Sequence, residues 1–186
     1  THGGISQRLV AFARSLVGGV QGGLASSCVL TCMVFAAISG SSVATTFAIG
    51  AILIPAMVKQ GYPVGMAGAI QAASAELGVI IPPSVPLILY AVSTETSVTQ
   101  LFIAGLGPGL LVATSLVVMV QIWCRLRGYG REDGMGRKPI LKAIREAFWA
   151  LLMPVIIIGG IYGGIFTPTE AAAVSVVYAL VISMLV

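Results

Sequence analysis

The stretch Phe35–Val58, FAAISGSSVATTFAIGAILIPAMV, interrupts a long apolar run with four small polar residues near its centre. No charged residue occurs between Arg14 and the end of this stretch, a distance too long for one membrane-spanning helix. The polar residues 39–42 divide the run into two arms, Gly23–Ile38 and Val43–Val58. Each arm has about 16 residues, fewer than the roughly 20 that cross a bilayer core. We therefore expect a re-entrant helical hairpin whose two ends return to one face of the membrane.

The composition indicates an integral membrane protein. Of the 186 residues, 58% are hydrophobic and only 9% are charged, whereas a soluble domain has about 25% charged residues. Two further charge-free stretches follow Glu95 and Glu146, and each is long enough to cross a bilayer. Since a helix satisfies its own backbone hydrogen bonds in lipid, we expect an all-α membrane fold.

The positive charge is concentrated in one short polar segment, residues 125–147. This segment predicts a cytoplasmic loop under the positive-inside rule, because a nucleic-acid site would need a folded soluble surface to present it. Its seven basic residues outnumber its three acidic ones: Arg125, Arg127, Arg131, Arg137, Lys138, Lys142 and Arg145 against Glu132, Asp133 and Glu146.

The distribution of charge also favours the hairpin over a single tilted crossing. If the hairpin returns to its starting face, Arg8, Arg14, Lys59 and the basic segment share one side, and Glu95 lies opposite. A single crossing would separate Arg8 and Arg14 from Lys59, against the positive-inside rule.

A second interruption lies in the apolar residues 64–93. Proline lacks an N–H group, so Pro82 leaves the carbonyl of Gly78 without its helical partner and Pro83 does the same for Val79. We expect a broken helix, and irregular backbone at membrane depth persists only where it is buried in protein or lines a cavity.

The remaining elements follow from periodicity and capping. Residues 5–17 predict an amphipathic helix at the membrane surface, and residues 98–124 a continuous span after a capping box. Residues 138–150 predict an amphipathic helix before a span over 151–165, and a last helix opens at Thr167. We expect three regions: 1–124 as the end of a first repeat, with the surface helix, hairpin 23–59, broken helix 64–93 and span 98–124; 125–147 as a basic cytoplasmic linker; and 148–186 as the start of a second repeat.

The hairpin tip offers two kinds of polar backbone group. The first arm ends with its carbonyls near Ser39 and Gly40, which suit a cation, and the second begins with N–H groups and the positive end of a helix dipole, which suit a carboxylate. Ser41, Ser42 and Thr45 are the candidate substrate-binding residues. The alternative is that residues 39–42 are only a break packed against other helices.

The break after Gly78 would add a second set of carbonyls, and together the two breaks could enclose Na⁺ in backbone oxygens. The candidate Na⁺ ligands are Ser39, Gly40, Gly78, Ile81 and Pro83, the last two by the resemblance described below. The alternative is a proline kink that serves packing alone.

Two glutamates, the histidine and the cysteines have plainer interpretations. Glu76 lies one turn before the break in an apolar segment, where it could couple an ion or a proton, face a crevice, or stay protonated without a role. Glu170 fits a capping box with Thr167. The only histidine, His2, is far from the tip serines along the chain, and the three cysteines are interpreted as small buried hydrophobic residues.

Four motifs in this order resemble the large membrane subunit of the tripartite ATP-independent periplasmic (TRAP) transporters. They are the quoted hairpin stretch, GVIIPPSVPLILYAVS (78–93), LFIAGLGPGLL (101–111) and MPVIIIGGIYGGIFTPTEAAAVSVVYALV (153–181). The resemblance implies an elevator-type secondary transporter built from two inverted repeats, each with a re-entrant hairpin and a broken helix. It places residues 39–42 at the first hairpin tip, and Gly78, Ile81 and Pro83 in the loop that contributes carbonyls to one Na⁺ site.

The same resemblance implies the partners and location. These are a small four-helix membrane subunit, a periplasmic substrate-binding protein, and a carboxylate such as a C4-dicarboxylate or a sugar acid, imported with Na⁺ across the bacterial inner membrane. We expect no other cofactor, no nucleic-acid partner and no enzymatic activity.

The sequence departs from the family pattern in two respects. It resembles a fragment that begins after the opening helices and stops early in the second repeat, so the second hairpin and second ion site would lie elsewhere. Glu76 stands where the resemblance implies a small polar residue. Two other functions stay open at this point: a single-component transporter of another elevator family, and an intramembrane hydrolase that uses Ser41 or Ser42.

Overall fold

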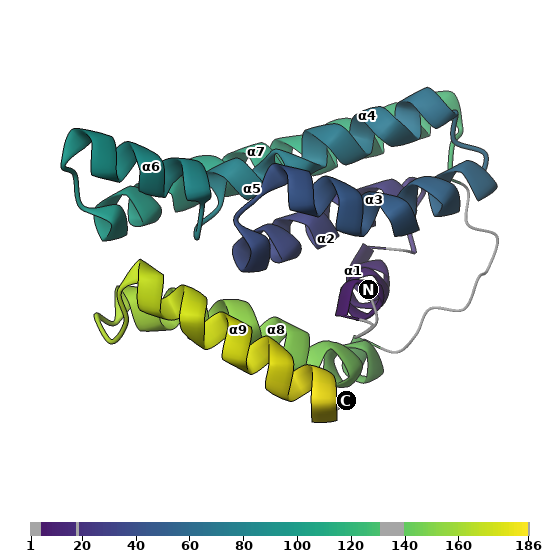
Figure 1. Cartoon of the computed structure of the whole chain (residues 1–186). Helices are drawn as coiled ribbons and strands as arrows, with labels where there is room; N and C mark the ends of the chain where they lie inside the picture. Colours follow the sequence, from purple (N-terminus) through teal and green to yellow (C-terminus); the bar gives the residue numbers. More distant parts are fainter. Residues whose placement is uncertain (1–4, 18, 131–139, 186) are drawn as a thin grey trace.

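The computed structural model describes residues 5–17, 19–130 and 140–185, and within these ranges the regular secondary structure is helical (Figure 1). Most helix boundaries fall at the glycines and prolines that interrupt the apolar pattern. The helices are α1 (Ile5–Val17), α2 (Gly23–Ser39), α3 (Ser42–Lys59), α4 (Val64–Ala75), α5 (Leu77–Ile80), α6 (Val85–Thr94), α7 (Val98–Arg127), α8 (Ile140–Tyr162) and α9 (Pro168–Leu185).

Helices α2 and α3 form the predicted helical hairpin. Gly40 ends α2 in the left-handed conformation, with φ 61°, and its N–H donates to the Ala36 carbonyl at 2.9 Å. Ser41 then starts α3, because its hydroxyl accepts a hydrogen bond from the Ala44 N–H at 3.3 Å. This left-handed glycine followed by an N-cap serine reverses the chain within two residues.

Both ends of the hairpin lie at the C-terminal end of α7. The Gly22 N–H, just before α2, donates to the Gly130 carbonyl at 3.2 Å. Just after α3, the ring of Tyr62 stacks on that of Tyr129, with centroids 6.0 Å apart. The tip of the hairpin lies beside α5, well short of the far end of α6 (Figure 1).

Helices α4, α5 and α6 form the predicted broken helix. The chain leaves helical geometry at Ile81 and resumes it after Ser84, which caps α6, and the peptide bond between Pro82 and Pro83 is cis. The Ser84 hydroxyl donates to the Val79 carbonyl at 2.5 Å, so it replaces the N–H that Pro83 lacks. The break is thus held by a specific side chain.

Helix α7 packs along this broken helix through two glycines one turn apart. A Cβ added at Gly105 would lie 2.9 Å from the Ile80 carbonyl oxygen, and one at Gly109 would lie 2.8 Å from a side-chain carbon of Ile81. Only glycine allows α7 to come this close to the break.

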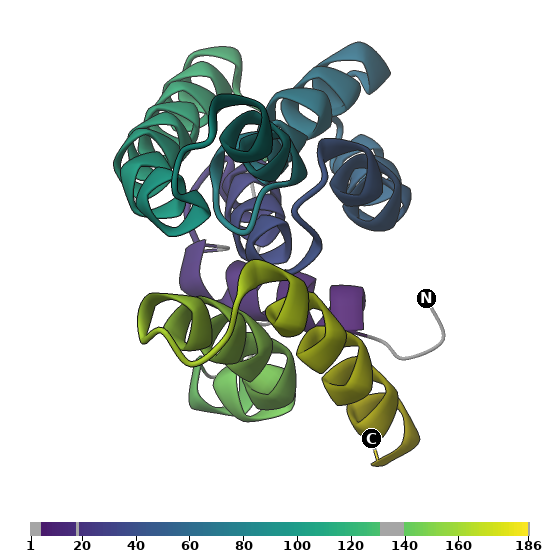
Figure 2. The same cartoon turned by 60° about the vertical axis from the view of Figure 1, so that its left-hand side comes forward.

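Helices α8 and α9 pack side by side on the other side of α1 from the hairpin (Figures 1 and 2). The buried face of α1, with Leu9 and Ala13, contacts α2 and α8. Helix α8 is one continuous helix to Tyr162, so the predicted amphipathic segment and the span that follows it belong to the same helix. The Thr167–Glu170 capping box is present, with the Thr167 N–H and hydroxyl each 2.8 Å from a Glu170 carboxylate oxygen.

Among the residues that the structure describes, four segments are long and apolar enough to cross a membrane: Ser42–Lys59, Val64–Thr94, Val98–Arg127 and Leu141–Tyr162. Their surfaces expose many large apolar side chains, among them Phe47, Leu111 and Val155, as expected of helices that face lipid. Of the predicted basic linker 125–147, the first and last parts belong to α7 and α8, and residues 131–139 lie outside the described residues.

Candidate functional site

The hairpin tip and the helix break lie in direct contact. The Val85 N–H, at the start of α6, donates to the Gly40 carbonyl at 3.3 Å. A Cβ added at Gly78 would lie 2.9 Å from the Ser41 carbonyl carbon and 3.0 Å from the Ser42 nitrogen, and one added at Gly40 would overlap the Pro83 carbonyl oxygen. Two glycines therefore allow two stretches of irregular backbone to touch.

Four helix ends meet at this contact. Helices α2 and α5 end here, at Gly40 and Ile81, and helices α3 and α6 begin here, at the capping residues Ser41 and Ser84. The ends of α2 and α5 present carbonyl groups, while the starts of α3 and α6 present N–H groups and positive dipole ends. The arrangement suits a cation and an anion in neighbouring positions.

The tip side chains form a small hydrogen-bonded cluster. The buried Thr45 hydroxyl donates to the Ser41 carbonyl at 2.8 Å and lies 3.2 Å from the Ser39 hydroxyl oxygen. The side chains of Ser39, Ser41 and Ser42 are partly exposed at the tip. Thr45 therefore lies beneath the tip, while the three serines lie on it.

The break supplies carbonyl groups that lack helical partners. Pro82 has no N–H for the Gly78 carbonyl, and Pro86 has none for the Pro82 carbonyl. The Leu87 N–H, the helical partner expected for the Pro83 carbonyl, instead donates to the Ser84 hydroxyl at 3.5 Å. Of the predicted Na⁺ ligands, Gly40 already accepts one hydrogen bond at its carbonyl, which keeps a second lone pair.

One acidic residue, Glu76, lies close to the break along the chain. Glu76 is the residue between α4 and α5, and its side chain is exposed. Within the described ranges, no group of three His, Cys, Asp or Glu side chains could hold a metal ion. The Na⁺ ligands predicted from the sequence are carbonyl and hydroxyl oxygens, and both they and the coupling role of Glu76 stay predictions.

Sequence reasoning missed three residues that support the site. Gly105 and Gly109 bring α7 against the break, and their Gly-x-x-x-Gly spacing is a known signal of close helix packing. Gln71 is a buried polar residue of α4 that contacts both arms of the hairpin. A polar residue within an otherwise apolar helical segment was the sequence signal that could have identified Gln71.

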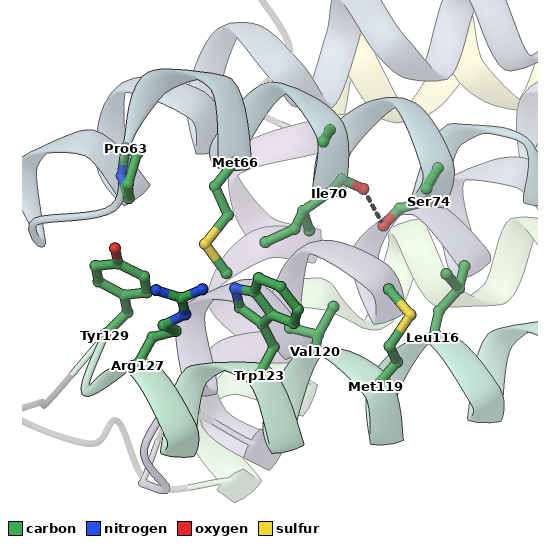
Figure 3. A pocket seen from close by; sticks show the side chains of 12 residues that line it. Pro63, Met66, Ile70, Ser74, Leu116, Met119, Val120, Trp123, Arg127 and Tyr129 are labelled. Atoms are coloured by element: carbon green, nitrogen blue, oxygen red, sulfur yellow. Dashed lines mark hydrogen bonds between the residues drawn. The ribbon is translucent and has the colours of Figure 1, made fainter.

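An apolar groove of about 590 Å³ lies between α4 and α7, away from the tip (Figure 3). At one end the Arg127 guanidinium lies over the Trp123 ring, 5.4 Å from its centroid. Its lining includes none of the residues predicted for substrate or ion binding.

Comparison with known proteins places the chain in one family. Residues 1–186 match the family described as tripartite ATP-independent periplasmic transporter, DctM component. The chain is 47% identical over its whole length to the C4-dicarboxylate TRAP transporter large permease protein DctM of Pseudomonas aeruginosa, and covers 44% of that protein. It is 44% identical over 98% of its length to the sialic acid TRAP transporter large permease protein SiaM of Vibrio cholerae, and covers 43% of it.

A third relative is the ectoine TRAP transporter large permease protein TeaC of Halomonas elongata. The chain is 41% identical to it over its whole length and covers 44% of that protein. The chain thus spans less than half the length of these curated relatives. They are transport proteins, which confirms the expectation that the chain is not an enzyme and argues against the hydrolase alternative. The match also excludes a transporter of another family: this chain belongs to the DctM component family, the large permease subunits of TRAP transporters.

Proposed function

We propose that this chain forms the first ion site and part of the substrate site of a Na⁺-coupled permease for small organic anions. The observation that carries the proposal is the convergence of four helix ends where Gly40 lies against Pro83 and Gly78 lies against Ser41. Polar backbone of this kind is costly in a membrane unless it binds a ligand or is satisfied within the protein.

The cation would be held by oxygens from both stretches. Na⁺ is a hard cation, so carbonyl and hydroxyl oxygens suit it and no carboxylate ligand is required. The carbonyls of Gly78, Ile81 and Pro83 on the break, with Ser39 and Gly40 on the tip, are the proposed ligands. The lack of helical partners at the break supports this choice.

The anionic group of the substrate would lie at the start of α3. The N–H groups there, with the hydroxyls of Ser41 and Ser42, suit a carboxylate, and Thr45 would support them from beneath through its bond to the Ser41 carbonyl. The relatives are named for C4-dicarboxylate, isethionate, sialic acid and ectoine, compounds that share a carboxylate or sulfonate group and differ elsewhere. A site for that shared group fits the part of the permease represented by this chain.

The rest of the assembly belongs to the same proposal. The complete permease would work in the bacterial inner membrane with a small membrane subunit and a periplasmic binding protein that delivers the substrate. Within it, the α2–α3 hairpin would be re-entrant, and residues 1–124 and 148–186 would belong to two inverted repeats of an elevator-type transporter.

Uptake by the complete complex in proteoliposomes tests this function. With a labelled C4-dicarboxylate and the binding protein present, uptake should require an inward Na⁺ gradient and should stop when K⁺ replaces Na⁺. Labelled sialic acid, isethionate and ectoine, each with its cognate binding protein, would define the substrate. Equal uptake in K⁺ would reject Na⁺ coupling, and failure of every anion would reject the substrate class.

A further inference from the structure

Gln71 is a polar side chain enclosed in the apolar core between three helices. It lies in the middle of α4, only 1% exposed, among the buried residues of α2 and α3. A carboxamide in such a place is costly unless its donor and acceptor groups find partners.

The Gln71 carboxamide finds partners on both arms of the hairpin. Its oxygen accepts from the Cys28 thiol of α2 at 3.0 Å, and its nitrogen donates to the Thr45 carbonyl of α3 at 3.4 Å. Gly50 of α3 makes the space for this side chain, since a Cβ there would lie 3.2 Å from the Gln71 Cγ. One residue of α4 thus connects α2 and α3 below the tip.

The connection continues to the tip through Thr45. The carbonyl of Thr45 accepts from Gln71, and the hydroxyl of Thr45 donates to the Ser41 carbonyl at 2.8 Å. The same hydroxyl lies 3.2 Å from the Ser39 hydroxyl oxygen. On the other side, α4 leads through Glu76 into the break at Gly78. Gln71 therefore lies on the broken helix α4–α6, which carries the break. It also contacts Thr45, which supports the hairpin tip.

We propose that Gln71 is a positioning residue that fixes the hairpin tip relative to the helix break, and so sets the affinity for the coupling cation. This inference rests on the function proposed above. It assigns to Gln71 no contact with the ion or the substrate. Its effect is through the placement of Thr45 and the Ser41 backbone.

The test compares two substitutions on the buried face of α4 in the complete transporter. Gln71→Met keeps the length of the side chain and removes its hydrogen bonds. Ser74→Ala is the matched control, because the buried Ser74 hydroxyl donates to the Ile70 carbonyl of its own helix, at 2.6 Å (Figure 3). We expect Gln71→Met to raise the Na⁺ concentration for half-maximal uptake about tenfold with little change in maximal rate, and Ser74→Ala to leave both unchanged.

A purely structural role predicts another result. Looser packing alone would lower the amount of folded transporter, and hence the maximal rate, while the Na⁺ dependence of the surviving molecules stayed at the wild-type value. That result would overturn the inference. Na⁺-independent uptake by the wild type would instead reject the proposed function, so the two failures are distinguishable.

Two further measurements keep the inference testable if Gln71→Met folds poorly. Thr45→Val interrupts the same connection one step later, and the double variant should lose no more Na⁺ affinity than the stronger single variant; additive losses would contradict the connection. In a Ser42→Cys background, Gln71→Met should also increase the rate of maleimide labelling at the tip relative to Ser74→Ala, a readout independent of transport. An unchanged labelling rate would count against positioning.

Discussion

At the scale of single residues, Gly40 meets two demands at once. Its φ of 61° is in the left-handed region, and an added Cβ would overlap the Pro83 carbonyl oxygen. Gly40→Ala should therefore separate the tip from the break and raise the half-maximal Na⁺ concentration about tenfold or more. Uptake by purified, monodisperse transporter at varied Na⁺ measures this effect.

Gly61→Ala is the matched control for that substitution. Gly61 also has a positive φ, 84°, but nothing lies within 4 Å of a Cβ placed there. Both variants carry a backbone strain of roughly 1–2 kcal/mol, and only Gly40→Ala adds a contact at the site. Equal Na⁺ dependence in the two variants would show that strain alone matters.

The residues of the site were predictable where local backbone chemistry reveals them. The small polar residues 39–42 and the prolines after Gly78 mark interruptions of helices, and an interruption in an apolar segment can be found from one sequence. Gln71 could not be assigned in this way, because its partners Cys28 and Thr45 lie on other helices. The pattern also could not show that Thr45 is buried beneath the tip.

At the scale of elements, the break in α4–α6 depends on its prolines. Pro83→Ala would restore an N–H that can reach the Val79 carbonyl, which the Ser84 hydroxyl now serves. We expect a longer α5 and displaced carbonyls. In uptake measurements at varied Na⁺, the Na⁺ concentration for half-maximal uptake should therefore rise severalfold. Pro55→Ala, at an exposed proline inside the unbroken α3, should leave Na⁺ dependence unchanged. If Pro83→Ala and Pro55→Ala have the same half-maximal Na⁺ concentration, the break does not form the ion site.

Helix boundaries followed the sequence closely where a cap or a proline marks them. Ser41, Ser84, Ser97 and Thr167 each begin a helix as their side-chain chemistry favours. In α8 the pattern changes from amphipathic to apolar near Ala150, and the helix continues through this change. No glycine or proline interrupts the backbone there, and Pro154 is accommodated within the helix, so the change in side chains alters the surroundings of the helix and not its path.

At the scale of the whole molecule, the two ends of the hairpin and the basic end of α7 lie together, while the turn between α6 and α7 lies at the opposite end (Figure 1). If the hairpin is re-entrant, single cysteines at Val20 and Lys59 should react with an impermeant maleimide from the cytoplasmic side, because positive charge marks that side. A cysteine in place of Glu95 should react only from the periplasmic side. Cys28, Cys32 and Cys124 of this chain are buried, and the parent protein without an added cysteine gives the background labelling. Labelling of Val20→Cys and Lys59→Cys from opposite sides would mean that this segment crosses the bilayer once, and the proposed re-entrant arrangement of α2 and α3 would be rejected.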